Sequence, residues 1–388
     1  MSPQTFAGLG LSAAASRALA ARGIETPFPV QSMVLPDVLA GRDVLVKSPT
    51  GSGKTLAFGA PMADRIAATD ARPAGLVLAP TRELASQIVD ELHDVMHARA
   101  LNITAVYGGA GIAKQARLAP RAHVLVATPG RLQDLLDRGA VSLGNVRMLV
   151  LDEADRMLDM GFRPAVDRIV RLTSAERQTL LFSATLDGEV GRIATEYTTD
   201  ARLHEHAATA ERRGAIDHRF IRVIHERKLD HLVQELRDAE PARALVFVRT
   251  KRGADRLVKR LGARSVDAVA MHGDKSQAQR EKALARFESG RIDTLVATDV
   301  AARGIDVAGI THVINFDAPA QTEDYVHRIG RTARAGASGV GITFVVDDQA
   351  RDVSRLATEL GLERELQVAG LQATQTRPRP RQRPRRRR

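Results

Sequence analysis

Residues 43–55 read DVLVKSPTGSGKT, a short apolar run followed by a turn that holds two glycines and ends in Lys-Thr. The glycines let the backbone N–H groups of such a turn point toward phosphates at the start of a helix. Ser48 stands where the general phosphate-loop pattern has glycine. The stretch therefore predicts a strand, a phosphate-binding loop and a helix, with Lys54 reaching the outer phosphates and Thr55 ligating Mg²⁺. The alternative, a strand–helix turn without a ligand, is disfavoured by the Lys-Thr ending.

The same pattern of a short apolar run, a turn and a helix-like stretch recurs along the chain. The further runs are GLVLA (75–79), HVLVA (123–127), MLVL (148–151), TLLF (179–182), ALVFV (244–248), DAVAM (267–271), TLVA (294–297), HVIN (312–315) and GITFVV (341–346). Continuous apolar strands that alternate with helices indicate parallel sheets covered on both faces. We therefore predict an α/β fold in which ligands bind at the carboxyl ends of the strands.

The runs fall into two series, which predicts two α/β lobes. Between them, the segment ARLHEHAATAERRGAID (201–217) is polar and lacks an apolar period, so we expect it to link the lobes. We place the first lobe at 1–205, the second at 206–365 and a tail at 366–388.

Charge and composition separate a nearly balanced body from a basic tail. The formal net charge of the 388 residues is 57 − 46 = +11, and the segment RPRPRQRPRRRR (377–388) supplies eight arginines. Repulsion between these charges predicts disorder, and the tail is either a phosphate-binding arm or a solvated segment that aids solubility. The chain has no cysteine, which excludes disulfides, and no apolar run of about 18 residues, so we expect no membrane span. We expect a cytoplasmic monomer.

An acidic pair follows another apolar run, in LVLDEAD (149–155). Two carboxylates at the end of a buried strand are costly unless they meet a cation. Asp152 suits Mg²⁺, directly or through water, and Glu153 suits the orientation and deprotonation of an attacking water. A helix N-terminal cap is the alternative, which the neighbouring phosphate loop disfavours.

Motifs in a fixed order carry a resemblance to a known family. They are SPTGSGKT (48–55), PTREL (80–84), TPGR (128–131), DEAD (152–155), SAT (183–185), ATDVAARGID (297–306) and HRIGRTARAG (327–336). With them the chain resembles the DEAD-box family of ATP-dependent RNA helicases, within superfamily 2, over residues 6–350. The resemblance implies two tandem RecA-like lobes, ATP and Mg²⁺ as cofactors, and RNA with ribonucleoproteins as partners.

The resemblance implies that GIETPFPVQ (23–31) reads adenine, with Gln31 hydrogen-bonding the base edge and Phe6 as a separate aromatic contact. Two residues depart from the family pattern: Ile24 replaces an aromatic residue and Phe28 replaces Thr or Ser, which weakens stacking and removes a hydrogen bond. Packing in the core is the alternative for Phe6 and Phe28. The implied nucleotide-binding residues are Phe6, Gln31, Ser48, Thr50, Gly51, Ser52, Gly53, Lys54, Thr55, Gly304 and Asp306.

RNA contacts are implied through glycine N–H groups, hydroxyls and arginines, which suit phosphates and sugars rather than bases. Aromatic residues make up 3% of the chain, which argues against base-stacking recognition. The implied RNA-binding residues are Pro80, Thr81, Arg82, Gly108, Gly109, Thr128, Pro129, Gly130, Arg131, Arg249, Thr250, Gln277, Arg280, Thr298, Asp299 and Arg303. The residues implied to couple hydrolysis to strand separation are Asp155, Ser183, Thr185, His327 and Arg328.

In HRIGRTARAG (327–336), Arg331 and Arg334 are implied to reach the γ-phosphate of ATP bound by the first lobe, while Asp306 contacts its ribose. The predicted catalytic residues are Glu153, Lys54, Arg331 and Arg334. We expect an RNA-dependent ATPase in which lobe closure switches on hydrolysis and parts a short RNA duplex. An ATP-gated RNA clamp with little strand separation and a DNA-directed motor are the alternatives.

Between those two arginines, Ala333 stands where the family usually has glycine. If this position adopts a positive φ, alanine costs about 1 kcal/mol or more. The second arginine is then aimed differently.

Overall fold

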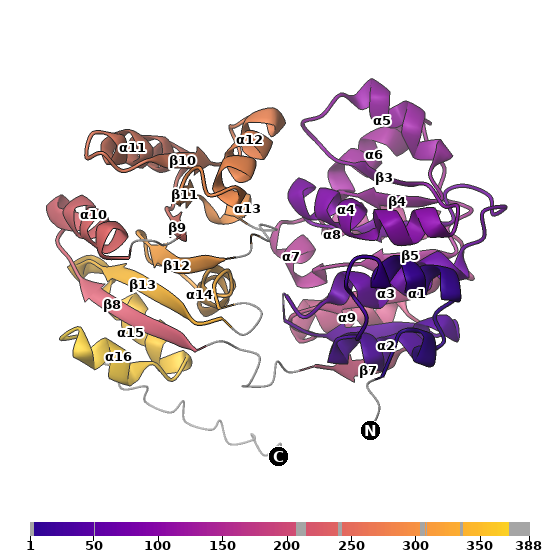
Figure 1. Cartoon of the computed structure of the whole chain (residues 1–388), viewed down its shortest axis with the longest axis horizontal. Helices are drawn as coiled ribbons and strands as arrows, with labels where there is room; N and C mark the ends of the chain where they lie inside the picture. The colour runs from indigo at the N-terminus through magenta and orange to yellow at the C-terminus, as the bar shows by residue number, and fades with distance from the viewer. Residues whose placement is uncertain are drawn as a thin grey trace, which may run out of the picture. The chain divides into compact units, whose positions relative to one another are not determined.

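The computed structural model describes residues 4–49, 51–206, 215–239, 243–302, 307, 309–333 and 337–371. The chain divides into two compact units, one holding the described residues up to 206 and the other those from 215 onward. Figure 1 shows that each unit is built around its own sheet. In the described part of the chain, no helix is both long enough and apolar enough to span a membrane.

The first unit contains a seven-stranded sheet in which every strand pair is parallel. Its strands are β1 (Val44–Lys47), β2 (Gly75–Leu78), β3 (Ile103–Val106), β4 (Val124–Ala127), β5 (Met148–Leu151), β6 (Gln178–Ser183) and β7 (Arg202–Glu205). They lie in the order β3-β4-β2-β5-β6-β1-β7. The order places the phosphate-loop strand β1 beside β6, so the motifs that follow these two strands meet at the carboxyl end of the sheet.

Helices cover both faces of this sheet (Figure 1). They are α1 (Ala13–Ala20), α2 (Pro29–Leu39), α3 (Lys54–Arg65), α4 (Arg82–Ala98), α5 (Ile112–Leu118), α6 (Pro129–Asp137), α7 (Ala154–Asp159), α8 (Arg163–Leu172) and α9 (Gly188–Tyr197). On β2, Val77 belongs to the core under α1–α4, whereas Leu76 and Leu78 belong to the core under α6, α8 and α9. Both faces of the strand are therefore buried, which explains its unbroken apolar sequence.

The second unit contains a six-stranded parallel sheet in the order β10-β11-β9-β12-β13-β8. Its strands are β8 (Ile216–Arg222), β9 (Arg243–Phe247), β10 (Ala268–Met271), β11 (Thr294–Ala297), β12 (Ile310–Asn315) and β13 (Gly339–Val345). Its helices are α10 (Lys228–Asp238), α11 (Lys251–Gly262), α12 (Gln277–Glu288), α13 (Asp299–Ala302), α14 (Thr322–Ile329), α15 (Ala350–Glu359) and α16 (Glu363–Val368). On β13, Phe344 packs in the core with α10 and α11, and Val345 packs in the core with α15 and α16.

The predicted apolar runs are all strands, so the predicted α/β class is confirmed. Strands β3, β7 and β8 were not predicted, because each lies at or beside a sheet edge and carries exposed or half-exposed side chains instead of a continuous apolar run. Strand β7 pairs with β1, and β8 pairs with β13. Both ends of the predicted link at 201–217 therefore belong to the two sheets. Helix α16 runs past the predicted end of the second lobe, and its Leu366 is fully buried.

Candidate nucleotide and RNA site

Most of the predicted residues of the first unit lie at the carboxyl end of its sheet. Lys47, Leu78, Ala127, Leu151 and Ser183 are the last residues of β1, β2, β4, β5 and β6. Because these strands are parallel, the turns that follow them lie side by side at their carboxyl ends. The phosphate loop and the PTREL, TPGR, DEAD and SAT motifs are those turns.

The phosphate loop joins β1 to α3, whose first residue is Lys54. Gly53, the N-cap of this helix, adopts a left-handed φ of 89°, which a residue with a side chain rarely adopts. The buried Lys54 Nζ donates a hydrogen bond to the carbonyl oxygen of Ser48 at 3.1 Å. The Ser48 and Ser52 hydroxyls are hydrogen-bonded at 2.7 Å. The lysine is thus held at the helix start where a phosphate is favoured by the N-terminal N–H groups.

Gln31 connects the predicted adenine motif to the phosphate loop. Its Oε1 accepts a hydrogen bond from the N–H of Phe28 at 2.8 Å, and its Nε2 donates to the Gly53 carbonyl at 2.9 Å. A Cβ atom on Gly53 would lie 2.6 Å from Cδ2 of Phe28 and 2.7 Å from Nε2 of Gln31. Glycine at position 53 therefore allows the two motifs to touch.

The two aromatic residues of this region have different environments. Phe6 is 2% exposed and is part of the core under α1–α4, whereas Phe28 is 46% exposed. The packing alternative therefore describes Phe6 in this structure and does not describe Phe28. A base contact by Phe6 stays a prediction, and it requires this side chain to leave the core.

The acidic pair follows β5 and lies beside the lysine. Asp152 is buried, and burial raises the pKa of its carboxyl group to about 7; Lys54 acts against this rise and Glu153 adds to it. Its Oδ1 accepts a hydrogen bond from the N–H of Glu153 at 3.0 Å. A buried carboxylate and a threonine hydroxyl are oxygen donors of the kind that hold Mg²⁺, which is bound by one or two protein groups together with substrate phosphates. The donor set of Asp152 and Thr55 therefore fits Mg²⁺.

Glu153 has an unusual backbone conformation, with φ 51° and ψ 52°. This left-handed region costs about 1–2 kcal/mol for a residue with a side chain. The residue is the N-cap of α7 and is buried. Backbone strain of this kind is concentrated at functional sites.

The SAT motif contacts both the acidic motif and the phosphate loop through its backbone. The Oδ2 of Asp155 accepts a hydrogen bond from the N–H of Ala184 at 3.2 Å, and the N–H of Ser48 donates to the Ser183 carbonyl at 2.9 Å. The Ser183 hydroxyl accepts a hydrogen bond from the Thr185 N–H within the motif itself, at 3.3 Å. The hydrogen bond that joins the SAT motif to Asp155 is therefore donated by a backbone amide.

Arg82, at the start of α4, lies against the two glycines that follow β3. A Cβ atom on Gly109 would lie 2.0 Å from Nη1 of Arg82, and one on Gly108 would lie 3.5 Å from Nη2. Gly109 also has a φ of +83°. The two motifs predicted to bind RNA thus form one surface, and glycine at position 109 permits their contact.

Arg131 was predicted to bind RNA, but its guanidinium group is used within the protein. Its Nη1 donates to the Ala110 carbonyl at 3.1 Å and to Oε1 of Gln115 at 2.8 Å. Gln115 in turn donates to the Tyr107 carbonyl at 3.1 Å. Arg131 and Gln115 therefore position the glycine turn. The sequence analysis did not identify Gln115, a polar residue that the structure places at a buried position of α5.

In the second unit, Asp317 holds the backbone of the predicted RNA-binding residue Arg249. Its Oδ2 accepts a hydrogen bond from the Arg249 N–H at 2.9 Å, and its Oδ1 accepts one from Lys228 Nζ, also at 2.9 Å. Burial would raise the pKa of Asp317, but Lys228 and the Arg249 N–H outweigh it and hold this pKa below its ordinary value. Lys228 also lies 4.4 Å from the ring centroid of Phe316. Sequence reasoning missed Asp317 and Lys228.

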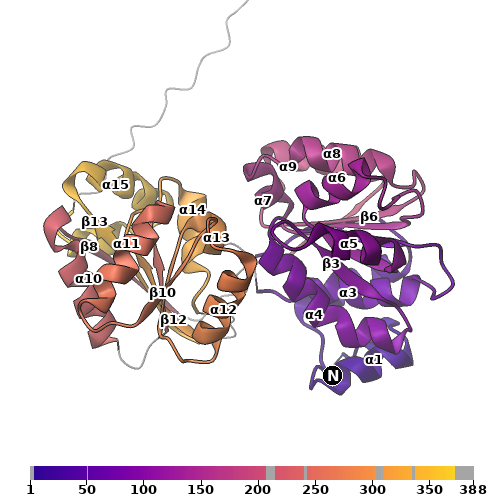
Figure 2. The same ribbon diagram turned by 90° about the horizontal axis from the view of Figure 1, so that it is seen from above.

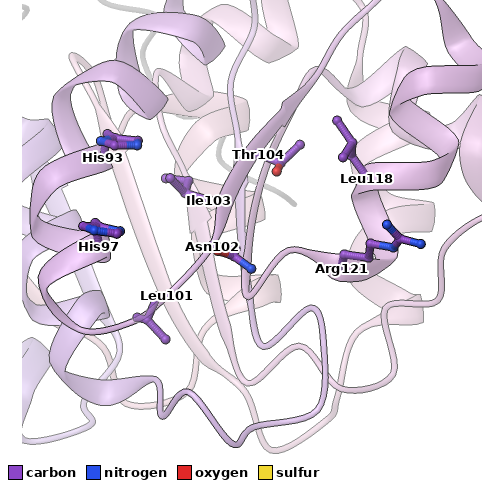
Figure 3. Close-up of a pocket in the computed structure, with 8 residues that line it drawn as sticks. All are labelled: His93, His97, Leu101, Asn102, Ile103, Thr104, Leu118 and Arg121. Carbon is purple, nitrogen blue, oxygen red and sulfur yellow. The ribbon is translucent and has the colours of Figure 1, made fainter.

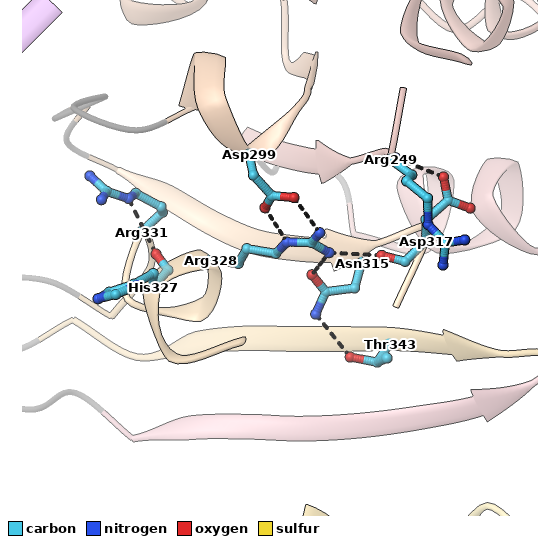
Figure 4. Close-up of polar contacts among 8 residues, drawn as sticks. All are labelled: Arg249, Asp299, Asn315, Asp317, His327, Arg328, Arg331 and Thr343. Carbon is cyan, nitrogen blue, oxygen red and sulfur yellow. Dashed lines mark hydrogen bonds and ion pairs between the residues drawn. The ribbon is translucent and has the colours of Figure 1, made fainter. Parts of the chain in front are cut away.

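Arg328 is bound on several sides within its own unit, as Figure 4 shows. Its Nε and Nη2 donate to the two carboxylate oxygens of Asp299 at 2.5 and 2.7 Å. Its Nη1 donates to Asn315 Oδ1 at 3.0 Å and to the Asp317 carbonyl at 2.7 Å, and Asn315 donates to the Thr343 hydroxyl. The sequence predicts Arg328 as a coupling residue and Asp299 as an RNA contact; in this structure they pair with each other.

Arg331 lies toward the amino end of the second sheet, where the hydroxyl of the neighbouring Thr332 donates to the carbonyl of Ile310, the first residue of β12. The other described motif residues follow the carboxyl ends of β9, β10 and β11. Arg331 is buried, and its Nε donates to the His327 carbonyl at 3.3 Å (Figure 4). Gln277 and Arg280 lie in the first turns of α12, which Ser276 caps. Thr298 directly precedes α13, and Thr250 caps α11 by accepting a hydrogen bond from the Gly253 N–H at 3.0 Å. The predicted residues that lie outside the described part of the chain are Thr50, Arg303, Gly304, Asp306 and Arg334.

Ala333 has a φ of 55°, so this position adopts the backbone conformation in which glycine is favoured. Replacing Ala333 with glycine is expected to raise the free energy of unfolding by about 1 kcal/mol, because glycine adopts this conformation without a steric penalty. Thermal denaturation of the full chain measures the change. Ala285→Gly, at an exposed position of α12, is the control and should lower stability by about 1 kcal/mol. Equal losses in both variants would contradict strain at Ala333.

A cavity of about 290 Å³ lies away from these motifs, at the amino end of the edge strand β3. Figure 3 shows His93 and His97 of α4 on one wall and Arg121 on the other. The two imidazole rings are stacked with centroids 6.1 Å apart. None of the predicted nucleotide or RNA residues lines this cavity.

Comparisons with known proteins agree with this arrangement of motifs. Residues 28–193 match the DEAD/DEAH box helicase family, and residues 227–336 match the helicase conserved C-terminal domain. The chain is 44% identical over 342 residues to the DEAD-box ATP-dependent RNA helicase CshA of Geobacillus kaustophilus, and the match covers 88% of this chain and 73% of that protein.

Two solved structures share the fold. Dbp5 of S. cerevisiae, bound to RNA and ADP BeF3, is 29% identical with a TM-score of 0.82, over 92% of this chain and 94% of that one. A DEAD box protein from Methanococcus jannaschii is 35% identical with a TM-score of 0.54, over 92% of this chain and 97% of that one.

Proposed function

Because the chain belongs to the DEAD-box family of ATP-dependent RNA helicases, we propose that it couples RNA-stimulated ATP hydrolysis to lobe closure and to local unwinding of short RNA duplexes or remodelling of ribonucleoproteins. The observation that carries the proposal is that hydrogen bonds connect the phosphate loop, the SAT motif and the DEAD motif at the carboxyl end of the first sheet. Ser48 of the phosphate loop bonds to Ser183, and Asp155 bonds to Ala184. A change at the phosphates is thereby transmitted to the DEAD and SAT turns.

ATP binding is proposed to exchange internal hydrogen bonds for contacts with phosphates. Lys54 leaves the Ser48 carbonyl and binds the outer phosphates, while Gln31 keeps its contact with Gly53 and reads the adenine edge. Thr55 and Asp152 would hold Mg²⁺, which would neutralise phosphate charge. Burial raises the pKa of Asp152, and a bound Mg²⁺ would act in the opposite direction by favouring the charged form of this carboxylate.

Hydrolysis is proposed to use groups from both lobes. Glu153 accepts a proton from the attacking water, whose oxygen forms the new bond to the γ-phosphorus as the bond to the β,γ-bridging oxygen breaks. Arg331 and Arg334 stabilise the negative charge on the γ-phosphate, and Asp306 contacts the ribose. Because these groups come from the second lobe, hydrolysis requires closure of the lobes.

RNA is proposed to lie over the turns that carry Arg82 and the two glycines in the first lobe, and over Arg249 and Thr250 in the second. These groups are cations, N–H groups and hydroxyls, which bind the sugar–phosphate backbone and carry no sequence information. RNA binding in both lobes would favour the closed state and so increase the rate of hydrolysis. Because this recognition does not depend on sequence, the RNA of a ribonucleoprotein is a substrate of the same kind.

The proposal is tested by measuring phosphate release by the full chain alone, with RNA, and with DNA of the same sequence, together with displacement of a short RNA duplex. We expect stimulation by RNA but not by DNA, and displacement only with ATP. Equal stimulation by DNA would favour a DNA-directed motor. RNA stimulation without displacement would favour the ATP-gated clamp.

A further inference from the structure

Helix α11 separates an apolar face from a strongly basic one. Ala254, Leu257 and Leu261 are buried against β10 and β11 in the core of the second unit. Figure 2 shows α11 on the outer side of this sheet, next to α10. On the opposite face of the helix lie Arg252, Arg256 and Lys259, which are all exposed. Their spacing of four and three residues keeps them on one side of an α-helix.

Among the described residues, these three side chains, which we call the basic face of α11, form no ion pair with a carboxylate. In the described part of the chain, none of the three has an acidic partner within 4.0 Å. The acidic residue of the helix, Asp255, is engaged on its flank by Lys275 at 2.8 Å and by His272 at 3.0 Å. Among the described residues, the basic face therefore presents three uncompensated positive charges to solvent.

The basic face begins next to two residues that the proposed function assigns to RNA. Thr250 is the N-cap of α11 and Arg249 precedes it, and both are exposed. From Arg252 to Lys259 the helix rises about 10 Å, at about 1.5 Å per residue. Neighbouring phosphates of one strand in a duplex are about 3.4 Å apart along its axis, so this length spans several phosphates. Two of the three groups are guanidinium forks, which match phosphate oxygens.

We propose that the basic face of α11 binds the sugar–phosphate backbone of RNA that extends beyond the segment held by Arg249 and Thr250. The inference rests on the proposed function, because it assigns an extension of that RNA site. An acidic protein surface has the same sign of charge as RNA, but the continuity of the basic face with Arg249 and Thr250 favours RNA. The face adds affinity for long RNA and leaves the hydrolysis site unchanged.

The test is the triple variant R252Q/R256Q/K259Q of the full chain, measured with single-stranded RNA of about 6 and about 20 nucleotides, lengths that bracket a typical site. We expect about 10-fold weaker binding of the longer RNA and unchanged binding of the shorter one. The slope of log affinity against log salt should become shallower by about 0.7 for each phosphate that the variant no longer neutralises. Turnover at saturating short RNA should equal that of the wild type.

The control is R351Q/R355Q/R364Q, which removes the same charge from exposed positions of α15 and α16 in the same unit. Unchanged long-RNA affinity and salt slope in the α11 variant would overturn the proposal. Equal losses in the control would also overturn it, because net charge alone would then explain the effect. Loss of binding to polyglutamate with RNA binding intact would assign the face to an acidic protein. A wild-type chain that RNA does not stimulate would instead refute the proposed function.

Discussion

Replacing Arg331 with alanine is expected to lower RNA-stimulated ATP turnover by about 10³–10⁵-fold, the range found when an arginine is withheld from the γ-phosphate of other nucleotide hydrolases. The positive charge of this residue stabilises the transition state more than the bound substrate, so the loss should fall on kcat rather than on KM. Steady-state phosphate release at saturating RNA measures it. The affinity for ATP should change far less.

Arg328→Ala is the matched comparison, three positions away in the same motif. Arg328 is buried and makes a two-pronged ion pair with Asp299, so its removal should cost about 3–5 kcal/mol of stability. Thermal denaturation then separates the two arginines, because loss of the two-pronged ion pair should lower the stability of the second variant more than that of the first. Turnover near the wild-type value in a folded Arg331→Ala protein would remove this residue from the catalytic group.

Glu153→Gln is expected to slow hydrolysis by about 10²–10⁴-fold, the usual contribution of a positioned general base. The amide has the shape of the carboxylate but cannot accept the proton of the attacking water. Glu153 is the N-cap of α7 with a left-handed backbone, and glutamine meets a similar steric cost in that conformation, so the substitution mainly removes the carboxylate. Single-turnover phosphate release with RNA measures the chemical step directly.

Binding of ATP and RNA provides the internal control for this variant. Both affinities should stay within a few-fold of the wild type, so that the variant accumulates in the ATP- and RNA-bound state. A wild-type rate of phosphate release would show that another group accepts the proton. Loss of ATP binding would instead indicate that the charge of the glutamate acts on Asp152, whose pKa the neighbouring Glu153 helps to raise.

The buried parts of the fold are predictable from the sequence, because strands covered on both faces are apolar throughout. Strand β5 (Met148–Leu151) is fully buried and is evident as an apolar run, whereas β7 (Arg202–Glu205) has mostly exposed side chains and falls within the predicted link. A short edge strand is specified by its pairing with β1, and that pairing is not visible in its own composition.

The candidate site is predictable as a set of motifs but not as a set of contacts. The resemblance implied RNA binding for Arg131 and coupling for Arg328. The structure pairs them with Gln115 and Asp299, which are distant in the sequence. An arginine in a motif has several compatible acceptors, and only tertiary structure selects among them. Ala333 shows the reverse case, since a single departure from glycine correctly indicated where to look for a positive φ.

The ion pair of the buried Lys228 with the half-buried Asp317 changes the electrostatic potential that a polyanion meets at the carboxyl end of the second sheet. Asp317 is bonded to the backbone of Arg249, so an uncompensated carboxylate there would cancel the charge of the arginine side chain. Lys228, beneath it, supplies the missing positive charge from inside the protein. The sum over these three groups is therefore +1 instead of zero, and it adds to the charges of α11. A lysine that is almost entirely shielded from solvent thus helps to set the sign of the long-range potential at this surface.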